Sequence, residues 1–389
     1  MGIVQRTSIV AVACVILATQ VWAADPEYKL GAIAALVGVG SYTGRPMMDG
    51  MNAAIAGINA RGGINGKKIN LVIRDDQSTG NVALANAREL IADKQILSII
   101  GVNSSLSAAA VGPLVESAQM PMISDAVPQN LLNPPRTGIF MANVSFATQG
   151  IAGVQFIKSL IEAGKAPSSP KVAILRYDSP ATQSWHEGVV NEAKALGFTV
   201  VADEVYALTG SDISPQVVRI ANARPDVMMT YSLLTQGSLL KSTFATAGIP
   251  ITTPQIGYNF VASKAFLGQF PDNAFFAPTG WNGGKGSPLE AQIAEDAKRV
   301  NVTADGGSFF EGYGIVLVAK AVLDKCGADC NRATFLKTLD NLTSDLGGFA
   351  FGTFNYTSNY HSGFTKLGFV TVEKGELVQV GPAIAVEQK

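Results

Sequence analysis

The chain has 389 residues, of which 47% are hydrophobic and 15% charged, so it can build two separate cores and is not a disordered chain. Its formal net charge is −1, from 29 basic and 30 acidic residues. This balance excludes the strongly basic surface of a nucleic-acid-binding protein, and no nucleic-acid partner is predicted.

The first 23 residues have the pattern of a secretory signal peptide. Arg6 supplies a positive charge, residues 9–18 form an apolar run, and a Val-Trp-Ala sequence ending at Ala23 fits a cleavage site. The apolar run is too short to span a bilayer. We expect cleavage after Ala23, with Ala24 as the second choice, and export to the periplasm. Acylation of Cys14 is disfavoured because the apolar run continues past that residue.

Strands and helices alternate after this segment. Strands are predicted over 29–36, 68–74, 97–101, 121–124, 171–176, 200–206 and 226–231, and helices over 46–61, 81–93, 105–119, 149–163, 183–196, 214–223 and 236–247. Short loops that join buried strands to amphipathic helices predict parallel α/β sheets covered on both faces. The pattern runs twice, which predicts two doubly wound lobes.

The last part of the chain is less regular. Residues 309–323 predict a long apolar helix that belongs with the first lobe, and residues 349–356 are aromatic and extended. The segments 366–373 and 376–380 flank Lys374-Gly375 and predict a β-hairpin. Patterns alone leave open whether the chain crosses between the lobes once or three times.

A polar cluster follows the strand at 97–101. It contains Asn103, Ser104, Ser105 and Ser107, where the strand passes into a helix. A nucleophilic serine would need a histidine base, and the chain has only two histidines and no G-x-S-x-G turn, which disfavours a hydrolase. A helix N-terminus with added hydroxyl donors suits a carboxylate or phosphate instead. A plain helix cap needs only one of these residues, and both interpretations stay open.

Cofactor and metal motifs are missing from the sequence. The glycines of residues 38–44 have the wrong spacing for a dinucleotide turn, and residues 283–287 lack the spacing of a phosphate-binding loop. Neither histidine has a second ligand at a metal-site spacing, so no cofactor or metal is predicted. Cys326 and Cys330 form the mature pair, and in an oxidising compartment a local disulfide is favoured over two free thiols.

Other strand ends supply possible walls for a site. Tyr42 follows the first strand, residues 124–127 follow the fourth, residues 178–185 follow the strand at 171–176, and Tyr231 ends the strand at 226–231. Open α/β sheets bind ligands at the carboxyl ends of their strands. These residues therefore join the serine cluster as candidates for one site.

Long stretches of the chain resemble the periplasmic Leu/Ile/Val-binding protein family, the substrate-binding subunits of branched-chain amino-acid ABC transporters. They are KLGAIAALVGVGSYTGRPMMDGMNAAI, INARGGINGKKINLVIRDDQS, IIGVNSSLSAAAVGPLVE, MPMISDAVPQ, KVAILRYDSPATQSWHEGV and GFVTVEKGELV. The resemblance implies two α/β lobes with three crossovers that close on a ligand. It assigns 28–145 and 281–346 to one lobe, and 146–280 and 347–385 to the other.

The resemblance also implies roles for individual residues. Ser104 and Ser105 would hold the α-carboxylate of a ligand, and Trp281 would be a hinge aromatic. The other contacts matched to the family are Tyr42, Ala126, Val127 and Trp185, and we add Asn103, Tyr231, Tyr258 and Asn259 as candidate ligand contacts.

One departure from the family concerns the ammonium group of an amino acid. Family members that bind amino acids place an acidic residue after a strand of the second lobe, but this chain has Tyr258 and Asn259 there. Relative to the family, the loop after the fourth strand gains one acid, Asp125. This acid could face an ammonium or point away. A buried ammonium without an anionic partner is costly, so an aromatic or aliphatic carboxylate, or an amide, fits the aromatic residues better.

The sequence therefore predicts a periplasmic solute-binding protein that performs no chemistry and delivers a small carboxylate-bearing ligand to a membrane ABC permease as a monomer. The alternatives are a sensor subunit that presents such a ligand to a membrane receptor and, in another class, a secreted hydrolase that uses Ser104 or Ser105.

Overall fold

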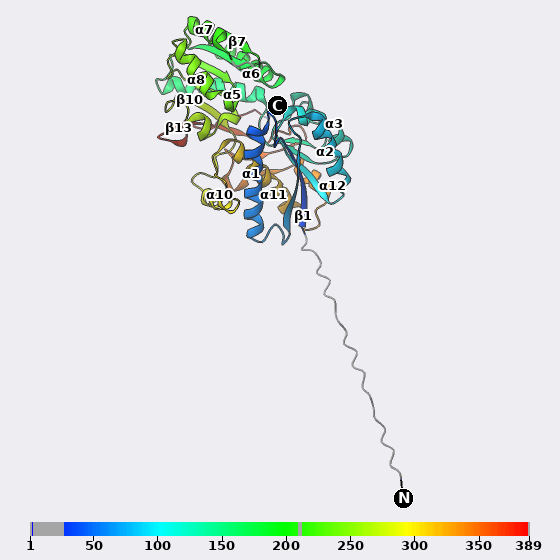
Figure 1. Cartoon of the computed structure of the whole chain (residues 1–389). Coiled ribbons are helices and arrows are strands. Elements are labelled where there is room, and N and C mark those ends of the chain that lie inside the picture. The colour runs from blue at the N-terminus through cyan, green and yellow to red at the C-terminus, as the bar shows by residue number, and fades with distance from the viewer. Residues whose placement is uncertain (1, 3–26, 209–211, 388–389) are drawn as a thin grey trace.

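The computed structural model describes residue 2 and residues 27–208 and 212–387. The predicted signal peptide, Cys14 included, lies outside these residues apart from Gly2. The described chain forms two α/β lobes, of which the second is drawn mainly in green (Figure 1). No helix of the described ranges combines the length and the apolar character needed to cross a membrane.

The first lobe is a five-stranded parallel sheet covered by helices. Its strands, in spatial order, are β2 (Lys68–Asp75), β1 (Glu27–Ala34), β3 (Ile96–Val102), β4 (Met122–Ser124) and β5 (Ile139–Met141). The helices beside them are α1 (Ser41–Ala60), α2 (Gly80–Ala92), α3 (Ser105–Ser117), α4 (Gln129–Leu132), α10 (Pro288–Arg299), α11 (Gly307–Cys326) and α12 (Arg332–Leu339). Every residue of β3 is buried, as expected for the middle of a parallel sheet.

Two glycines let α1 and α11 pack closely. A Cβ atom on Gly312 would lie 1.8 Å from the carbonyl oxygen of Met47, and one on Gly50 would lie 2.0 Å from that of Phe309. Only glycine allows the two backbones to approach this far. The contact places the first half of α11 in the middle of the molecule.

The second lobe has a larger sheet, in which a parallel part is extended by antiparallel strands. Its strands, in spatial order, are β14 (Glu376–Gln379), β13 (Lys366–Glu373), β10 (Phe275–Thr279), β9 (Gln255–Ile256), β8 (Val227–Tyr231), β6 (Lys171–Tyr177) and β7 (Thr199–Tyr206), and β15 (Ile384–Ala385) pairs with β13. The helices are α5 (Phe146–Glu162), α6 (Pro180–Ala195), α7 (Ser214–Ala223), α8 (Gly237–Thr246), α9 (Lys264–Leu267), η1 (Leu234–Gln236) and η2 (Asn259–Val261).

The chain passes between the lobes three times, which answers the question that the patterns left open. It crosses after β5, again after β10, and a third time before β13. The crossing segments pair with one another through bridges between Met141 and Ser362 and between Trp281 and Ala350. Before the third crossing lie η3 (Leu346–Gly348) and the paired short strands β11 (Thr343–Ser344) and β12 (Phe354–Asn355).

Three predicted helix starts were too late, those of α1, α5 and α6, and α5 begins at Phe146 and not at residue 149. α1 begins at Ser41 and not at Pro46, because the N–H groups of Thr43 and Gly44 already bond to the Gly40 carbonyl. A proline in the second turn removes only one backbone bond, so the helix tolerates it. α6 begins at Pro180, in the first-turn position that proline favours, with the Ser179 hydroxyl accepting from the Thr182 N–H.

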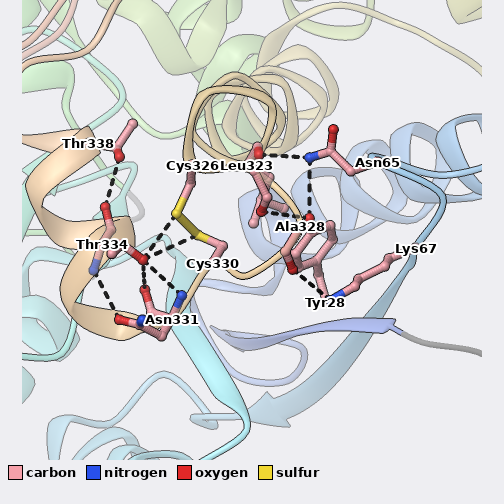
Figure 2. The surroundings of a disulfide bond; sticks show 11 residues. Tyr28, Asn65, Lys67, Leu323, Cys326, Ala328, Cys330, Asn331, Thr334 and Thr338 are labelled. Carbon is pink, nitrogen blue, oxygen red and sulfur yellow. Dashed lines mark hydrogen bonds between the residues drawn. A yellow bond between two sulfur atoms is a disulfide. The ribbon is translucent and has the colours of Figure 1, made fainter.

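The predicted disulfide is confirmed. Cys326 and Cys330 are bonded and close the turn between α11 and α12 (Figure 2). This turn is held against the start of the first sheet, because the Tyr28 hydroxyl donates to the Gly327 carbonyl at 2.9 Å and Lys67 Nζ to the Ala328 carbonyl at 2.6 Å. The disulfide thus lies at the amino-terminal edge of the sheet, opposite the strand ends that were expected to bind a ligand.

Candidate functional site

A cavity of about 500 Å³ lies between the two lobes. The first lobe supplies the start of α3 and residues 127–130, which include the start of α4, and the second supplies the end of β6, the start of α6 and Leu208. Phe146, at the first crossing, completes the lining. None of the described residues that line this cavity is an aspartate, glutamate, lysine, arginine or histidine. Its wall is therefore uncharged and largely apolar.

Ser104 and Ser105 are half-buried and line this cavity, as the sequence predicted. Ser104 occupies the cap position of α3, but its side chain makes no capping hydrogen bond. Neither hydroxyl has a hydrogen-bond partner among the described residues. The first turn of α3 adds free backbone N–H groups and a partial positive charge. This arrangement favours the donor-site interpretation over plain capping.

Asn103 and Ser107 point into the protein and not into the cavity. The Asn103 side chain accepts from the Ala35 N–H at 2.9 Å and donates to Thr43 Oγ1 at 3.0 Å, which fixes the turn between β1 and α1. The Ser107 hydroxyl donates to the buried Asp76 carboxylate at 2.7 Å. Both residues hold the scaffold of the serine pair, and the structure does not bring Asn103 to the cavity wall.

A layer of aromatic side chains lies beneath the cavity. Tyr177 lines the cavity, and its ring centroid is 5.5 Å from that of Tyr231. Tyr231 stacks on Tyr258 at 3.7 Å between ring centroids and meets Trp185 edge-on at 5.4 Å. These last three side chains are at most 1% exposed, so the structure places them in the floor and not on the surface of the cavity. Burial also raises the pKa of Tyr42 to about 12.

Two acids lie beyond this aromatic layer. Asp125 follows β4 and Glu311 belongs to α11, and their exposed fractions are 2% and 3%. Asn143 Nδ2 donates to Asp125 Oδ1 at 3.2 Å, and Asn259 Nδ2 donates to Glu311 Oε1 at 2.5 Å. Burial raises the pKa of Asp125 to about 7. The pKa of Glu311 is raised well above its ordinary value, first by burial and then by the charge of Asp125.

The remaining predicted contacts divide between the cavity and the core. Val127 and Ala126 are both 2% exposed, but only Val127 is part of the cavity lining, and the Ala126 carbonyl accepts from the Ser124 hydroxyl at 3.1 Å. Trp281 is buried at the second crossing, with ring centroids 5.3 Å from Phe349 and 4.5 Å from Phe364. Its side chain is not part of the cavity lining, and the hinge role expected for Trp281 stays a prediction.

The sequence analysis missed several parts of the site. Phe146 was not proposed, because it precedes the predicted start of its helix, and Leu208 stands in a loop without a pattern. Tyr177 could have been found as the last residue of a buried strand. Glu311 had one signal, since it is a single acid within the apolar sequence of α11.

A cavity enclosed by two α/β lobes with three crossings is the architecture of a two-lobed solute-binding protein. The comparison with known families agrees with this class. The model of the family described as periplasmic binding protein matches residues 27–376. The chain belongs to this family.

Individual relatives are distant but cover nearly the whole chain. The Leu/Ile/Val-binding protein homolog 7 of Brucella suis is 24% identical over 383 residues, which cover 93% of each chain. A branched chain amino acid ABC transporter structure from Thermus thermophilus with bound valine has a TM-score of 0.80 at 18% identity, covering 93% of this chain and 97% of that one. A fatty acid ABC transporter substrate-binding protein from Thermomonospora curvata has a TM-score of 0.78 at 22% identity, covering 94% of both.

Proposed function

We propose that this protein is a periplasmic substrate-binding subunit of an ABC importer that captures a small carboxylate-bearing solute between its lobes. The carrying observation is the serine pair, whose hydroxyls have no partner among the described residues, at the start of α3 in an uncharged cavity. Family membership supports a solute-binding role. The names of the relatives support an ABC permease as the partner. The protein would act as a monomer and perform no chemistry.

The composition of the cavity wall favours a ligand without an amino group. A carboxylate can be held by hydroxyls and a helix N-terminus, whereas a buried ammonium needs an anionic partner. The described lining offers none, and the rest of the wall includes Val127, Phe146, Pro180 and Leu208. Aromatic or aliphatic carboxylates, and amides, therefore fit this wall better than α-amino acids. The relatives include both a valine-bound protein and a protein named for fatty acids.

Titration calorimetry with leucine, benzoate and octanoate tests this proposal. We expect benzoate or octanoate to bind and leucine to bind much more weakly. Tight binding of leucine alone would contradict the proposed ligand class, and no binding of any carboxylate would contradict the proposed function.

Removal of both hydroxyls tests the serine pair. Ser104→Ala with Ser105→Ala should weaken binding by roughly 100-fold, since each hydrogen bond to a charged group contributes about 1.5–3 kcal/mol. Ser117→Ala, at the other end of α3, is the matched control and should bind like the wild type. Unchanged affinity in the double variant would return both serines to a structural role.

The hydrolase alternative loses support from the positions of the histidines. His186 Nε2 lies 2.6 Å from Asp203 Oδ2, and His361 Nδ1 lies 2.8 Å from the Ile139 carbonyl. Neither histidine lines the cavity or bonds to the serine pair. A serine nucleophile would therefore have no base.

A further inference from the structure

We propose that Asp125 and Glu311 form a proton-binding site that is linked to ligand capture, so that the protein takes up its anionic ligand together with at least one proton. This inference rests on the proposed function for the identity of the ligand but on separate residues for the proton.

The pair is enclosed by groups from both lobes. Asp125 and Glu311 belong to the first lobe, but Asn259, which bonds to Glu311, comes from the start of η2 in the second lobe. The Asn259 N–H in turn donates to Gln149 Oε1 of α5 at 3.1 Å. This bond holds Asn259 in place within the second lobe. Asn143, which bonds to Asp125, lies in the first crossing. A separation of the lobes would break the Asn259 contact and admit water to Glu311.

Each acid of the enclosed pair has a hydrogen-bond donor on one carboxyl oxygen only, and neither has a compensating charge. Asp125 Oδ2, Glu311 Oε2 and Asn259 Oδ1 are buried without a hydrogen-bond partner. Within residues 27–208 and 212–387, no lysine, arginine or histidine pairs with either carboxyl. Two buried carboxylates without a cation are very unfavourable, and protonation is the usual remedy.

The titratable groups around the pair are uncharged. Tyr231 of β8 interacts electrostatically with both carboxyls, and burial raises its pKa well above the ordinary value. The neighbouring tyrosines have raised pKa values for the same reason; they are Tyr42 of α1, Tyr177 of β6 and Tyr258 before η2. His361, from the third crossing, is directed to the Ile139 carbonyl and to Asp340, 3.8 Å away. Ser308 Oγ of α11 is the remaining close polar group.

Two backbone links connect the acid pair to the proposed ligand site. Asp125 is two residues before Val127 of the cavity wall, and its N–H donates to the Val102 carbonyl at 3.0 Å, next to the serine pair. A carboxylate bound at Ser104 and Ser105 adds a third negative charge beside the two acids. Capture of an anion therefore favours the protonated pair further.

The direction of the pH dependence follows from the raised pKa values. Enclosure raises the pKa of Asp125 to about 7 and that of Glu311 in the same direction, and if separation of the lobes admits water, both pKa values should fall back toward their ordinary range. Between about pH 4 and pH 7 the enclosed form therefore binds more protons. It is favoured as the pH falls through this window and disfavoured as the pH rises through 7.

Calorimetry can count the linked protons. Binding of benzoate or octanoate to the full protein at pH 7 is measured in two buffers of different ionisation enthalpy. We expect net proton uptake on binding, and an affinity that falls by up to about tenfold per pH unit between pH 5 and pH 7. Equal heats in both buffers, with an affinity independent of pH, would overturn the proposal.

Amide variants separate proton binding from binding of a ligand cation. Asp125→Asn and Glu311→Gln imitate the protonated acids, so each should keep carboxylate binding and reduce its pH dependence, and Asp49→Asn is the control. Loss of binding in folded amide variants, with binding of an amine-bearing ligand to the wild type, would instead show that a cationic group occupies the site.

A measurement without ligand keeps this inference separate from the proposed function. As the pH rises from 5.5 to 8, the free energy of unfolding of the wild type, measured with denaturant, should fall. It should fall by less in Asp125→Asn and in Glu311→Gln. An identical pH dependence in the wild type and in both variants would sink the inference, even if carboxylates bind as proposed.

Discussion

The wall of the cavity and the layer beneath it differ in the solvent exposure of their unpartnered polar groups. On the wall, Ser104 and Ser105 are half-buried, and their hydroxyls have no bond within the described protein. Beneath it, Asp125 and Glu311 are sealed, and each keeps one unpartnered oxygen. An accessible hydroxyl without a protein partner costs little folding free energy, because water can bond to it when no ligand is bound. A buried carboxylate without a partner costs much more. The comparison teaches that changes in the wall should affect affinity, and changes beneath it should affect stability and pH dependence.

The largest expected effect concerns the aromatic layer. Tyr231→Ala should lower the free energy of unfolding by about 3–5 kcal/mol, as for other buried aromatic residues, because the stacked Tyr258 and the edge of Trp185 lose their contacts. Denaturant unfolding measures this change. Tyr231→Phe, which keeps the ring, is the control and should stay within about 1 kcal/mol of the wild type.

A change far from the cavity should leave affinity untouched. Cys326→Ser with Cys330→Ser removes a short loop constraint and should lower the free energy of unfolding by about 2 kcal/mol. Carboxylate affinity should stay that of the wild type, because the disulfide lies at the opposite edge of the sheet (Figure 2). A large loss of affinity would show that the two edges of the first lobe are coupled.

The smallest effect tests the charge of the wall. Ser184 is half-buried and lines the cavity on the second lobe, facing an uncharged wall. Ser184→Asp should weaken binding of benzoate or octanoate by roughly tenfold through like-charge repulsion, while Ser184→Asn, of similar size, should bind nearly as the wild type. Tighter binding of an amine-bearing ligand to Ser184→Asp would favour a cationic ligand instead.

Short strands and crossings could not be read from local patterns. β5, β9 and β10 contain three, two and five residues and were not predicted, and each is a strand because a neighbouring strand supplies its backbone partners. Trp281 and Trp185 were proposed from the family resemblance, as a hinge aromatic and as a ligand contact. The structure packs both into cores, since a tryptophan side chain buries a large apolar area wherever a neighbour allows it.

The sequence by itself determined the alternation of strands and helices, the two-lobed class, the disulfide and the serine pair at a helix start. These features depend on neighbours along the chain, where hydrophobic period, capping positions and cysteine spacing act. Only the tertiary structure decided that Asn103 supports the loop, that Tyr231 and Tyr258 form a floor, and that the charge of Asp125 acts on Glu311. Those relations join residues from distant parts of the chain, and burial, which sets their charge, exists only once the lobes are assembled.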